Sequence, residues 1–128
     1  MDSRIFGYLL NKNILFDVNG RKLIQYQVDK PKQPFSFKVI ALSETQGRLF
    51  SFLLENRKSD LIDKNDIMKN VWDKFSLSSS SQRLWQTVND LRKTLEHFGL
   101  PGEFITNIHG AGYIVDKTKV IPLYSRQS

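Results

Sequence analysis

The chain has 128 residues, of which 40% are hydrophobic and 25% charged, a composition typical of one globular domain and unlike that of a disordered chain. It has no cysteine, which excludes disulfides and thiol catalysis, and its two histidines have no spacing that suits a metal ion. The net charge of +6 favours a polyanionic partner, and no stretch reaches the roughly 18 apolar residues that span a membrane.

Short strands are expected over the first third of the chain. Four segments are apolar throughout or alternate between apolar and polar side chains, as strands with one buried face do. These segments are residues 5–10, 14–18, 23–28 and 35–42. Asn19-Gly20 favours a tight hairpin turn, and residues 29–34 form an expected loop with two prolines. The pattern predicts a small antiparallel sheet of four strands.

Three helices are expected after this sheet. The first begins after Ser43, which with Gln46 has the form of a capping box, and its many apolar residues give it a broad buried face. The second, at residues 64–72, begins after the cap residue Asp63 and is followed by a loop at residues 73–78. A third helix follows this loop directly, so the second and third helices form a helix-turn-helix.

The segment 79–98 has the strongest helical pattern in the chain. Five apolar residues recur at spacings of four, three, four and three, which places them on one face of a helix. They are Leu84, Val88, Leu91, Leu95 and Phe98. The serines at 79–81 offer three alternative N-cap residues, and Gly99 and Pro101 mark the end of the helix.

The opposite face of this helix is rich in amide and cationic groups. It comprises Gln82, Gln86, Asn89, Asp90 and Lys93, with Arg83 on its flank. Gln and Asn side chains pair with adenine through two hydrogen bonds, and Arg and Lys reach guanine or phosphate. From the residues alone, this face fits either a helix that reads DNA or an ordinary solvated surface.

A hairpin is expected near the end of the chain. Short strands at 104–108 and 113–115 flank the sequence HGAG at 109–112, in which both glycines are expected to serve the geometry of a tight turn. The hairpin follows a helix-turn-helix and is therefore expected to be a wing. Residues 117–128 show no pattern and are expected to be a tail or the start of a linker.

This order of elements, with several sequence features in matching places, resembles the OmpR/PhoB-type winged helix-turn-helix DNA-binding domain of bacterial transcription regulators. The features are Leu42-Ser43 followed by Leu49-Phe50 and Leu53, Val71-Trp72, LRKTL at 91–95 and ITNIHGAGY at 105–113. The resemblance covers residues 5–115, within an expected domain at residues 1–116. Because the sheet begins within the first ten residues, the chain is most similar to the ToxR/CadC-like branch, which has no receiver domain.

Three residues depart from the pattern of this family. Gln46 stands where the family usually has Glu, Asn107 where Thr is common, and His109 where the tip of the wing often has Arg. The last two departures bear on how strongly the wing contacts DNA. If His109 contacts DNA, binding should strengthen as the imidazole gains charge at mildly acidic pH.

The resemblance implies an α+β fold, a winged helix-turn-helix with an N-terminal antiparallel four-stranded sheet, three helices and a C-terminal β-hairpin wing. It implies a sequence-specific transcription regulator that binds double-stranded DNA. The recognition helix 79–98 would lie in the major groove and the wing 104–115 at the adjacent minor groove. The residues expected to contact DNA are Ser81, Gln82, Arg83, Gln86, Thr87, Asn89, Asp90, Lys93, Asn107, His109 and Tyr113.

Neighbours of these residues have weaker assignments. Asp90 would repel phosphate unless it is paired, and Lys93 and Arg83 are the expected partners. Arg92 fits a phosphate contact and a structural role equally well. Trp85 lies to one side of the helix and is expected to pack beneath the wing or the second helix, and Trp72 is expected to close the core.

The resemblance also implies partners and a location. It implies a homodimer on DNA, a contact with RNA polymerase through the loop 73–78, and a cytoplasmic protein that is membrane-tethered if the natural chain continues past residue 128. No cofactor, metal or small-molecule ligand is expected, and no arrangement of residues indicates an enzyme. The alternative function is a winged-helix module for protein–protein interaction that has lost DNA binding, because the helix 79–98 is only weakly basic.

Overall fold

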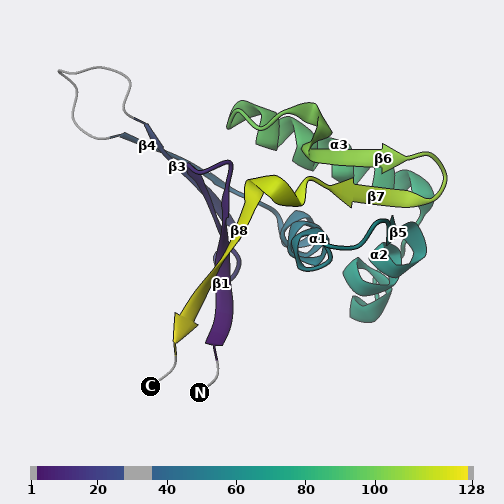
Figure 1. Ribbon diagram of the computed structural model, residues 1–128. Coiled ribbons are helices and arrows are strands. Elements are labelled where there is room, and N and C mark those ends of the chain that lie inside the picture. The colour runs from purple at the N-terminus through teal and green to yellow at the C-terminus, as the bar shows by residue number, and fades with distance from the viewer. Residues whose placement is uncertain (1–2, 28–35, 127–128) are drawn as a thin grey trace. The chain divides into compact units, whose positions relative to one another are not determined.

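The computed structural model describes residues 3–27 and 36–126. The chain divides into two compact units, with boundaries after Ser43 and after Thr118. The first unit is a β-sheet, and the second holds the helices and a smaller sheet (Figure 1). The expected α+β class, with three α-helices and antiparallel sheets, is confirmed.

The sheet unit has five antiparallel strands in the order β4-β3-β2-β1-β8. They are β1 (Ser3–Leu10), β2 (Ile14–Asp17), β3 (Lys22–Gln27), β4 (Ser36–Ala41) and β8 (Val120–Arg126). The Asn19-Gly20 pair does not form a two-residue turn, because β2 ends at Asp17 and the left-handed residue before β3 is Arg21, with φ of 53°. The expected loop at 29–34, with the strand ends at Val28 and Phe35, lies outside the described residues.

The strand β8 replaces most of the expected tail. A short 3₁₀ helix, η3 (Lys117–Lys119), leads into it, and β8 pairs along β1 from Ser3 opposite Arg126 to Leu10 opposite Val120. The expectation of a tail or linker over 117–128 is therefore wrong for its described part. A strand that includes Pro122 and has no alternating pattern is held in place by its partner at the other end of the sequence.

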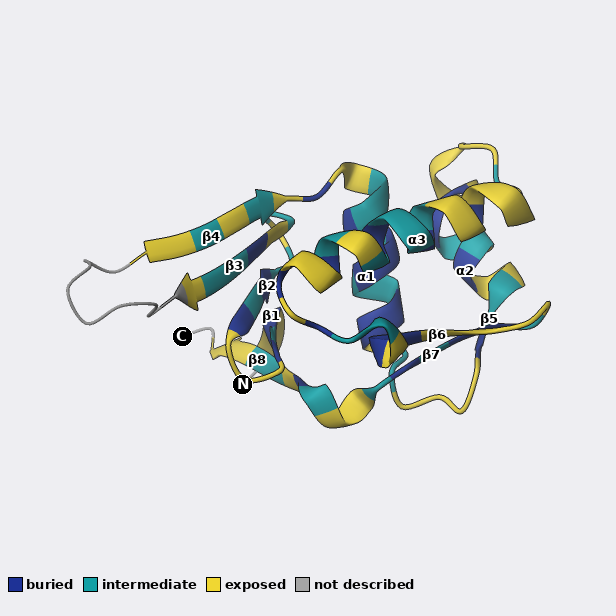
Figure 2. Cartoon of the chain, turned by 90° about the horizontal axis from the view of Figure 1, so that it is seen from above, coloured by how far each residue is buried: buried dark blue, intermediate teal, exposed yellow. Residues whose placement is uncertain are grey.

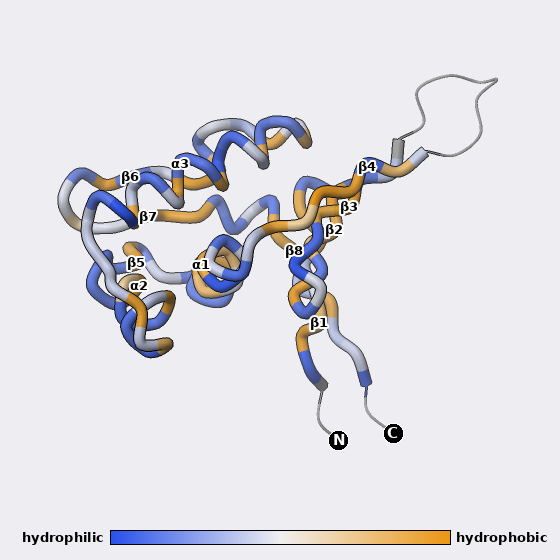
Figure 3. Tube along the Cα trace, turned by 180° about the vertical axis from the view of Figure 1, so that it is seen from behind, coloured by the Kyte–Doolittle hydropathy of each residue, from blue (hydrophilic) through white to orange (hydrophobic). Residues whose placement is uncertain are grey.

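One face of this sheet is buried and the other is partly exposed. Tyr8, Leu10, Ile14, Phe16 and Leu23 are each at most 1% exposed, and their neighbours along the strands point to the opposite face. Figure 3 shows the apolar character of β3 and β4. In β4, however, the alternating apolar residues do not form a buried face, because Phe37 and Val39 are 63% and 53% exposed.

The second unit contains α1 (Glu44–Glu55), α2 (Lys64–Val71) and α3 (Ser81–His97). Its sheet has the strand order β5-β7-β6, with β5 (Ile62–Asp63), β6 (Ile105–Ile108) and β7 (Gly112–Val115). Two 3₁₀ helices complete it, η1 (Asp73–Phe75) after α2 and η2 (Gly102–Phe104) before β6. The second helix and the hairpin lie where the sequence predicts, whereas the two-residue strand β5 was not expected.

The core of this unit lies around α1, which is largely buried (Figure 2). Leu49, Phe50, Leu53 and Leu54 are all fully buried, and the Phe50 ring meets the Phe104 ring edge-on, with 6.5 Å between the ring centroids. The five apolar residues of the 79–98 stripe are buried to at least 98%, and Trp72 is 2% exposed. The predicted buried faces are confirmed, as is the position of Trp72 in the core.

Side chains cap the two helices of the helix-turn-helix. The Asp63 carboxylate accepts hydrogen bonds from the backbone N–H groups of Asn65 and Asp66, at 3.0 and 3.2 Å, as the sequence predicts. Ser80 caps α3, because its Oγ accepts a hydrogen bond from the Arg83 N–H at 3.0 Å. Such caps fix where a helix begins, and here they fix which side chains α3 presents at its N-terminal end.

Candidate nucleic-acid interface

The N-terminal half of α3 presents a group of exposed polar side chains. Ser81, Gln82, Arg83 and Gln86 are all exposed, and Thr87 is half-buried. Together with the cap residue Ser80, the last four line an open hollow of about 350 Å³ on the helix surface. The structure thus brings together four of the residues that are expected to contact DNA.

The remaining predicted residues of α3 continue this face toward its C-terminal end. Lys93 is exposed, whereas Asn89 and Asp90 are half-buried. Gln86, Asn89 and Lys93 line a second hollow, of about 430 Å³, together with Trp85, Arg92 and Glu96. We call Gln82, Gln86, Asn89 and Lys93 the outward face of α3.

On one flank of the outward face, the side chains are held in place by hydrogen bonds within the chain. Arg83 donates from Nη1 to the Ser78 carbonyl oxygen at 2.7 Å, and the Thr87 hydroxyl donates to the Arg83 carbonyl oxygen at 2.8 Å. Asp90 accepts a hydrogen bond from Gln86 Nε2 at 3.0 Å, so the expectation that Lys93 or Arg83 pairs with Asp90 is wrong. We call this flank, made of Arg83, Thr87 and Asp90, the loop side of α3.

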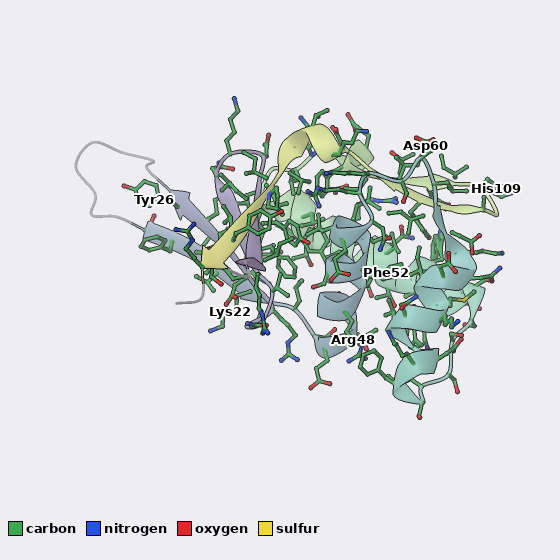
Figure 4. All side chains as sticks on the ribbon, turned by 60° about the horizontal axis from the view of Figure 1, so that its bottom comes forward. Lys22, Tyr26, Arg48, Phe52, Asp60 and His109 are labelled. Carbon is green, nitrogen blue, oxygen red and sulfur yellow. The ribbon has the colours of Figure 1, made fainter. Side chains whose placement is uncertain are left out.

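The wing is the hairpin of β6 and β7. The Ala111 N–H donates to the Ile108 carbonyl oxygen at 2.9 Å, and Gly110 takes the positive φ of 74° that such a turn requires. His109 lies at the tip of this hairpin (Figure 4) and is exposed, as is Asn107 on β6. Both side chains are therefore accessible to a partner.

Gly112 has a different function from the one expected. A Cβ atom at this position would clash with the carbonyl oxygen of Ile62, which lies on the adjacent strand β5. The glycine therefore permits β5 to approach β7, and it is Gly110 alone that serves the turn. The close approach anchors the wing to the segment that leads into α2, since Lys64 N–H also donates to the Ala111 carbonyl oxygen at 3.0 Å.

A third hollow, of about 250 Å³, lies where α3 faces the wing. Ser81, Leu84 and Trp85 of α3 line it, with Lys64 of α2 and, from the wing, Asn107 and residues 109–113. None of these lining residues carries a carboxylate. We call it the wing-side hollow.

Trp85 does not pack beneath the wing or α2 as expected. The residue is 51% exposed and contributes to both the wing-side hollow and the hollow beside Arg92 and Lys93. Helical spacing alone places Trp85 off the centre of the outward face, so its exposure could not be predicted from the sequence.

Tyr113 is 4% exposed, and its ring belongs to the core. Burial raises the pKa of its hydroxyl, and the nearby positive charge of Arg92 acts in the opposite direction. The Arg92 guanidinium is half-buried and donates from Nη1 to Asn89 Oδ1 at 3.5 Å. Arg92 of α3 therefore interacts electrostatically with Tyr113 of the wing.

Among residues 3–27 and 36–126, no three His, Asp or Glu side chains come close enough together to hold a metal ion. No helix in this part of the chain has the length and apolarity to cross a membrane.

A family model described as "Transcriptional regulatory protein, C terminal" matches residues 37–115, which is more than half of the chain. The chain belongs to this family. Its OmpR/PhoB-type winged helix, expected from the sequence, is therefore confirmed, and the protein carries a DNA-binding domain of a transcription regulator.

A solved structure with the same fold is the DNA-binding domain of E. coli CadC. It superposes on this winged-helix domain with a TM-score of 0.67 at 15% sequence identity, and the match covers 95% of this chain and 100% of that chain. A comparison with curated protein sequences finds no match. At 15% identity the structural likeness supports the fold but does not identify the residues that contact DNA.

Proposed function

We propose that this winged-helix domain binds double-stranded DNA in a sequence-specific manner, with α3 in the major groove and the wing at the adjacent minor groove. The observation that carries this proposal is the group formed by Gln82, Arg83 and Gln86, which line one open hollow at the N-terminal end of α3. Recognition helices contact base edges mainly with their N-terminal residues.

The chemistry of these side chains suggests their roles. Gln82 and Gln86 carry the amide that pairs with adenine, and Arg83 carries the guanidinium that pairs with guanine. Ser81, Thr87, Asn89 and Lys93 lie around them and fit contacts with phosphate or neighbouring bases. Asp90 acts indirectly in this proposal, because its hydrogen bond to Gln86 orients the amide that meets the base.

The wing supplies the second part of the proposed interface. Asn107 and His109 are exposed on the hairpin and fit contacts in or beside the minor groove. Tyr113 fits a contact through its hydroxyl alone, because its ring lies in the core and the residue also lines the wing-side hollow.

A binding selection with a random-sequence duplex library, repeated at several salt concentrations, tests this proposal. The wild-type domain is expected to enrich one motif, and its affinity should fall steeply with salt because phosphate contacts release counterions. An Arg83→Ala, Gln86→Ala double variant should lose preference for that motif by roughly ten- to hundredfold while it keeps weak, salt-dependent binding. Lys58→Ala, which also removes one exposed cation but lines none of the three hollows, is the matched control.

The alternative function is distinguished by the same selection. A wild-type domain that enriches no motif and shows no salt-dependent binding contradicts the DNA proposal and favours the module for protein–protein interaction. A double variant that keeps the full motif preference contradicts only the base contacts assigned to Arg83 and Gln86. The proposal that the domain binds DNA would stand.

A contact with RNA polymerase is proposed for the segment between α2 and α3. Phe75 and Leu77 are 49% and 43% exposed there, and the Arg48 guanidinium lies 4.2 Å from the centroid of the Phe75 ring. Arg48 also donates from Nε to the Val71 carbonyl oxygen at 3.1 Å, so α1 holds this segment in place. Binding of the purified polymerase to the domain on DNA tests this contact, and native mass spectrometry of the same complex tests the proposed homodimer.

A cytoplasmic location follows from the proposed partner, since bacterial DNA and RNA polymerase are found there. Its test is fractionation of cells that express the natural protein.

A further inference from the structure

We infer that Trp85 and the wing-side hollow bind the sugar–phosphate strand of DNA that separates the major groove from the minor groove. This inference rests on the proposed function and adds to it two residues, Trp85 and Lys64, and a contact with the strand between the two grooves. It assigns Trp85 a positioning role, because sugar and phosphate carry no sequence information directly.

The position of the wing-side hollow fits a backbone strand of DNA. When a helix lies in the major groove and a hairpin lies at the adjacent minor groove, the backbone strand between the two grooves runs between the helix and the hairpin. The wing-side hollow occupies this position, because α3 lines one side of it and the wing lines the other. The side chain that α3 places there with the largest apolar surface is Trp85.

The charge of the wing-side hollow suits a polyanion. The residues around the hollow include the cation Lys64, the hydroxyl of Ser81 and the imidazole of His109, and none of them is acidic. A polyanion entering the hollow therefore meets hydrogen-bond donors and no carboxylate. An acidic peptide would meet the same donors, but its backbone lacks the apolar deoxyribose that an indole ring can cover.

The two tryptophans of the chain differ sharply in their exposure. Trp72 is 2% exposed and fills the core. Trp85 is 51% exposed, although the apolar stripe of the same helix is buried. A large aromatic ring left open to water is costly to hydrate, and such rings are enriched where a partner covers them. An indole also has one N–H donor, which suits a phosphate oxygen at the edge of a covered sugar.

The two tryptophans make the test possible without a label. Fluorescence quenching by acrylamide acts mainly on Trp85 in the free domain, since Trp72 is buried. Addition of the duplex selected by the wild-type domain should lower the quenching constant toward that of the Trp85→Phe variant, in which only Trp72 emits. The selected duplex is the probe, and its binding is measured in parallel by fluorescence anisotropy of an end-labelled strand.

Variants separate the positioning role from a role in folding. Trp85→Ala should weaken binding about tenfold for preferred and non-preferred duplexes alike, because it removes apolar contact area without removing a base contact. Trp85→Phe should recover part of that loss. Lys64→Gln should lower the slope of log affinity against log salt by about one, since it removes one phosphate contact. Tyr124→Ala, whose ring is 58% exposed on β8 and lies outside the hollow, should leave affinity unchanged.

The outcomes distinguish this inference from the proposed function. If the wild-type domain binds no duplex, the proposed function fails and the inference fails with it. If it binds and selects a motif but acrylamide still quenches Trp85 as in the free domain, or if a folded Trp85→Ala variant binds with wild-type affinity, the inference alone is overturned. Loss of motif preference in Trp85→Ala would also overturn it, because Trp85 would then contact a base.

Discussion

The loop side and the wing side of α3 differ in how far their side chains are already engaged. On the loop side, Arg83 is bonded to the Ser78 carbonyl oxygen, Thr87 to its own helix, and Asp90 to Gln86. On the wing side, Trp85 is half-exposed beside a hollow that contains no acidic group. The two flanks of one helix are therefore built in different ways.

This difference indicates two different tasks. Side chains whose rotamers are held by hydrogen bonds lose less conformational freedom when a partner binds, which suits contacts that must discriminate between bases. An open hollow with an aromatic ring and donors accepts any nucleotide sequence, which suits a contact that sets position. We expect specificity to depend on the loop side and on the outward face, and register on the DNA to depend on the wing side.

We expect Gly112→Ala to disturb the wing side of α3 strongly while it leaves the loop side unchanged. The new Cβ would clash with the Ile62 carbonyl oxygen, so β5 and β7 must separate, at a cost of roughly 1–3 kcal/mol in the free energy of unfolding. Urea denaturation, monitored by circular dichroism, measures this cost. Chemical shifts of the amides of residues 105–115 should change while that of Arg83, capped by Ser80, stays the same. Gly102→Ala is the control, because the only contact a Cβ meets there is the flexible Glu96 side chain at 3.5 Å; equal stability of the two variants would contradict the prediction.

A smaller effect is expected for Asp90→Asn on the loop side. The amide oxygen keeps an acceptor for Gln86 Nε2 while the negative charge is removed, so affinity for every duplex should rise about two- to threefold at low salt. Asp90→Ala removes the charge and the acceptor together, and it should also relax the preference at the base that Gln86 contacts. Anisotropy titrations with matched and mismatched duplexes measure both effects. An identical specificity profile for the Ala and Asn variants would show that the hydrogen bond does not orient Gln86.

The smallest effect is expected at alkaline pH. The pKa of Tyr113 is raised above its ordinary value of 10.0 in the folded protein by burial, so the unfolded chain loses this proton first. Stability from the neutral hydroxyl is complete below pH 10 and declines as the pH rises from there through the raised pKa. Tyr113→Phe should make this decline shallower in urea denaturation curves recorded across that range. Tyr124→Phe, at a ring that is 58% exposed, is the control and should leave the decline as in the wild type.

The parts of the structure that depend on nearby residues were predictable from the sequence. The buried stripe of α3, the Asp63 cap and the place of Trp72 in the core follow from helical spacing and from side chains within three residues of the atoms they contact. The sequence did not indicate which of the three serines caps α3, because they are consecutive and carry the same hydroxyl group. The structure shows that it is Ser80.

The parts that depend on distant residues were missed. The strand β5 has two residues and exists because Gly112 lets it approach β7, a condition set 49 residues further along the chain.

The partner of Asp90 was missed for another reason, since Gln86 and Lys93 both lie within one turn of it and the sequence cannot rank an amide against an ammonium group. Of the candidate site, the sequence therefore predicted which residues share a face of α3, but it did not predict which of them are bonded to each other or that Trp85 is open to solvent.

The register between β1 and β8 sets an order for folding during synthesis. Ser3 pairs with Arg126, so the first described strand meets one of its two neighbours only when the end of this sequence has been made. The helical unit is continuous from Glu44 to Thr118 and needs no residue outside that range for its own sheet. Because closing a long loop costs chain entropy before its contacts form, we expect the helical unit to fold first and the sheet to be completed last. A growing chain would thus acquire its proposed DNA-binding surface while the edge of β1 is still unpaired.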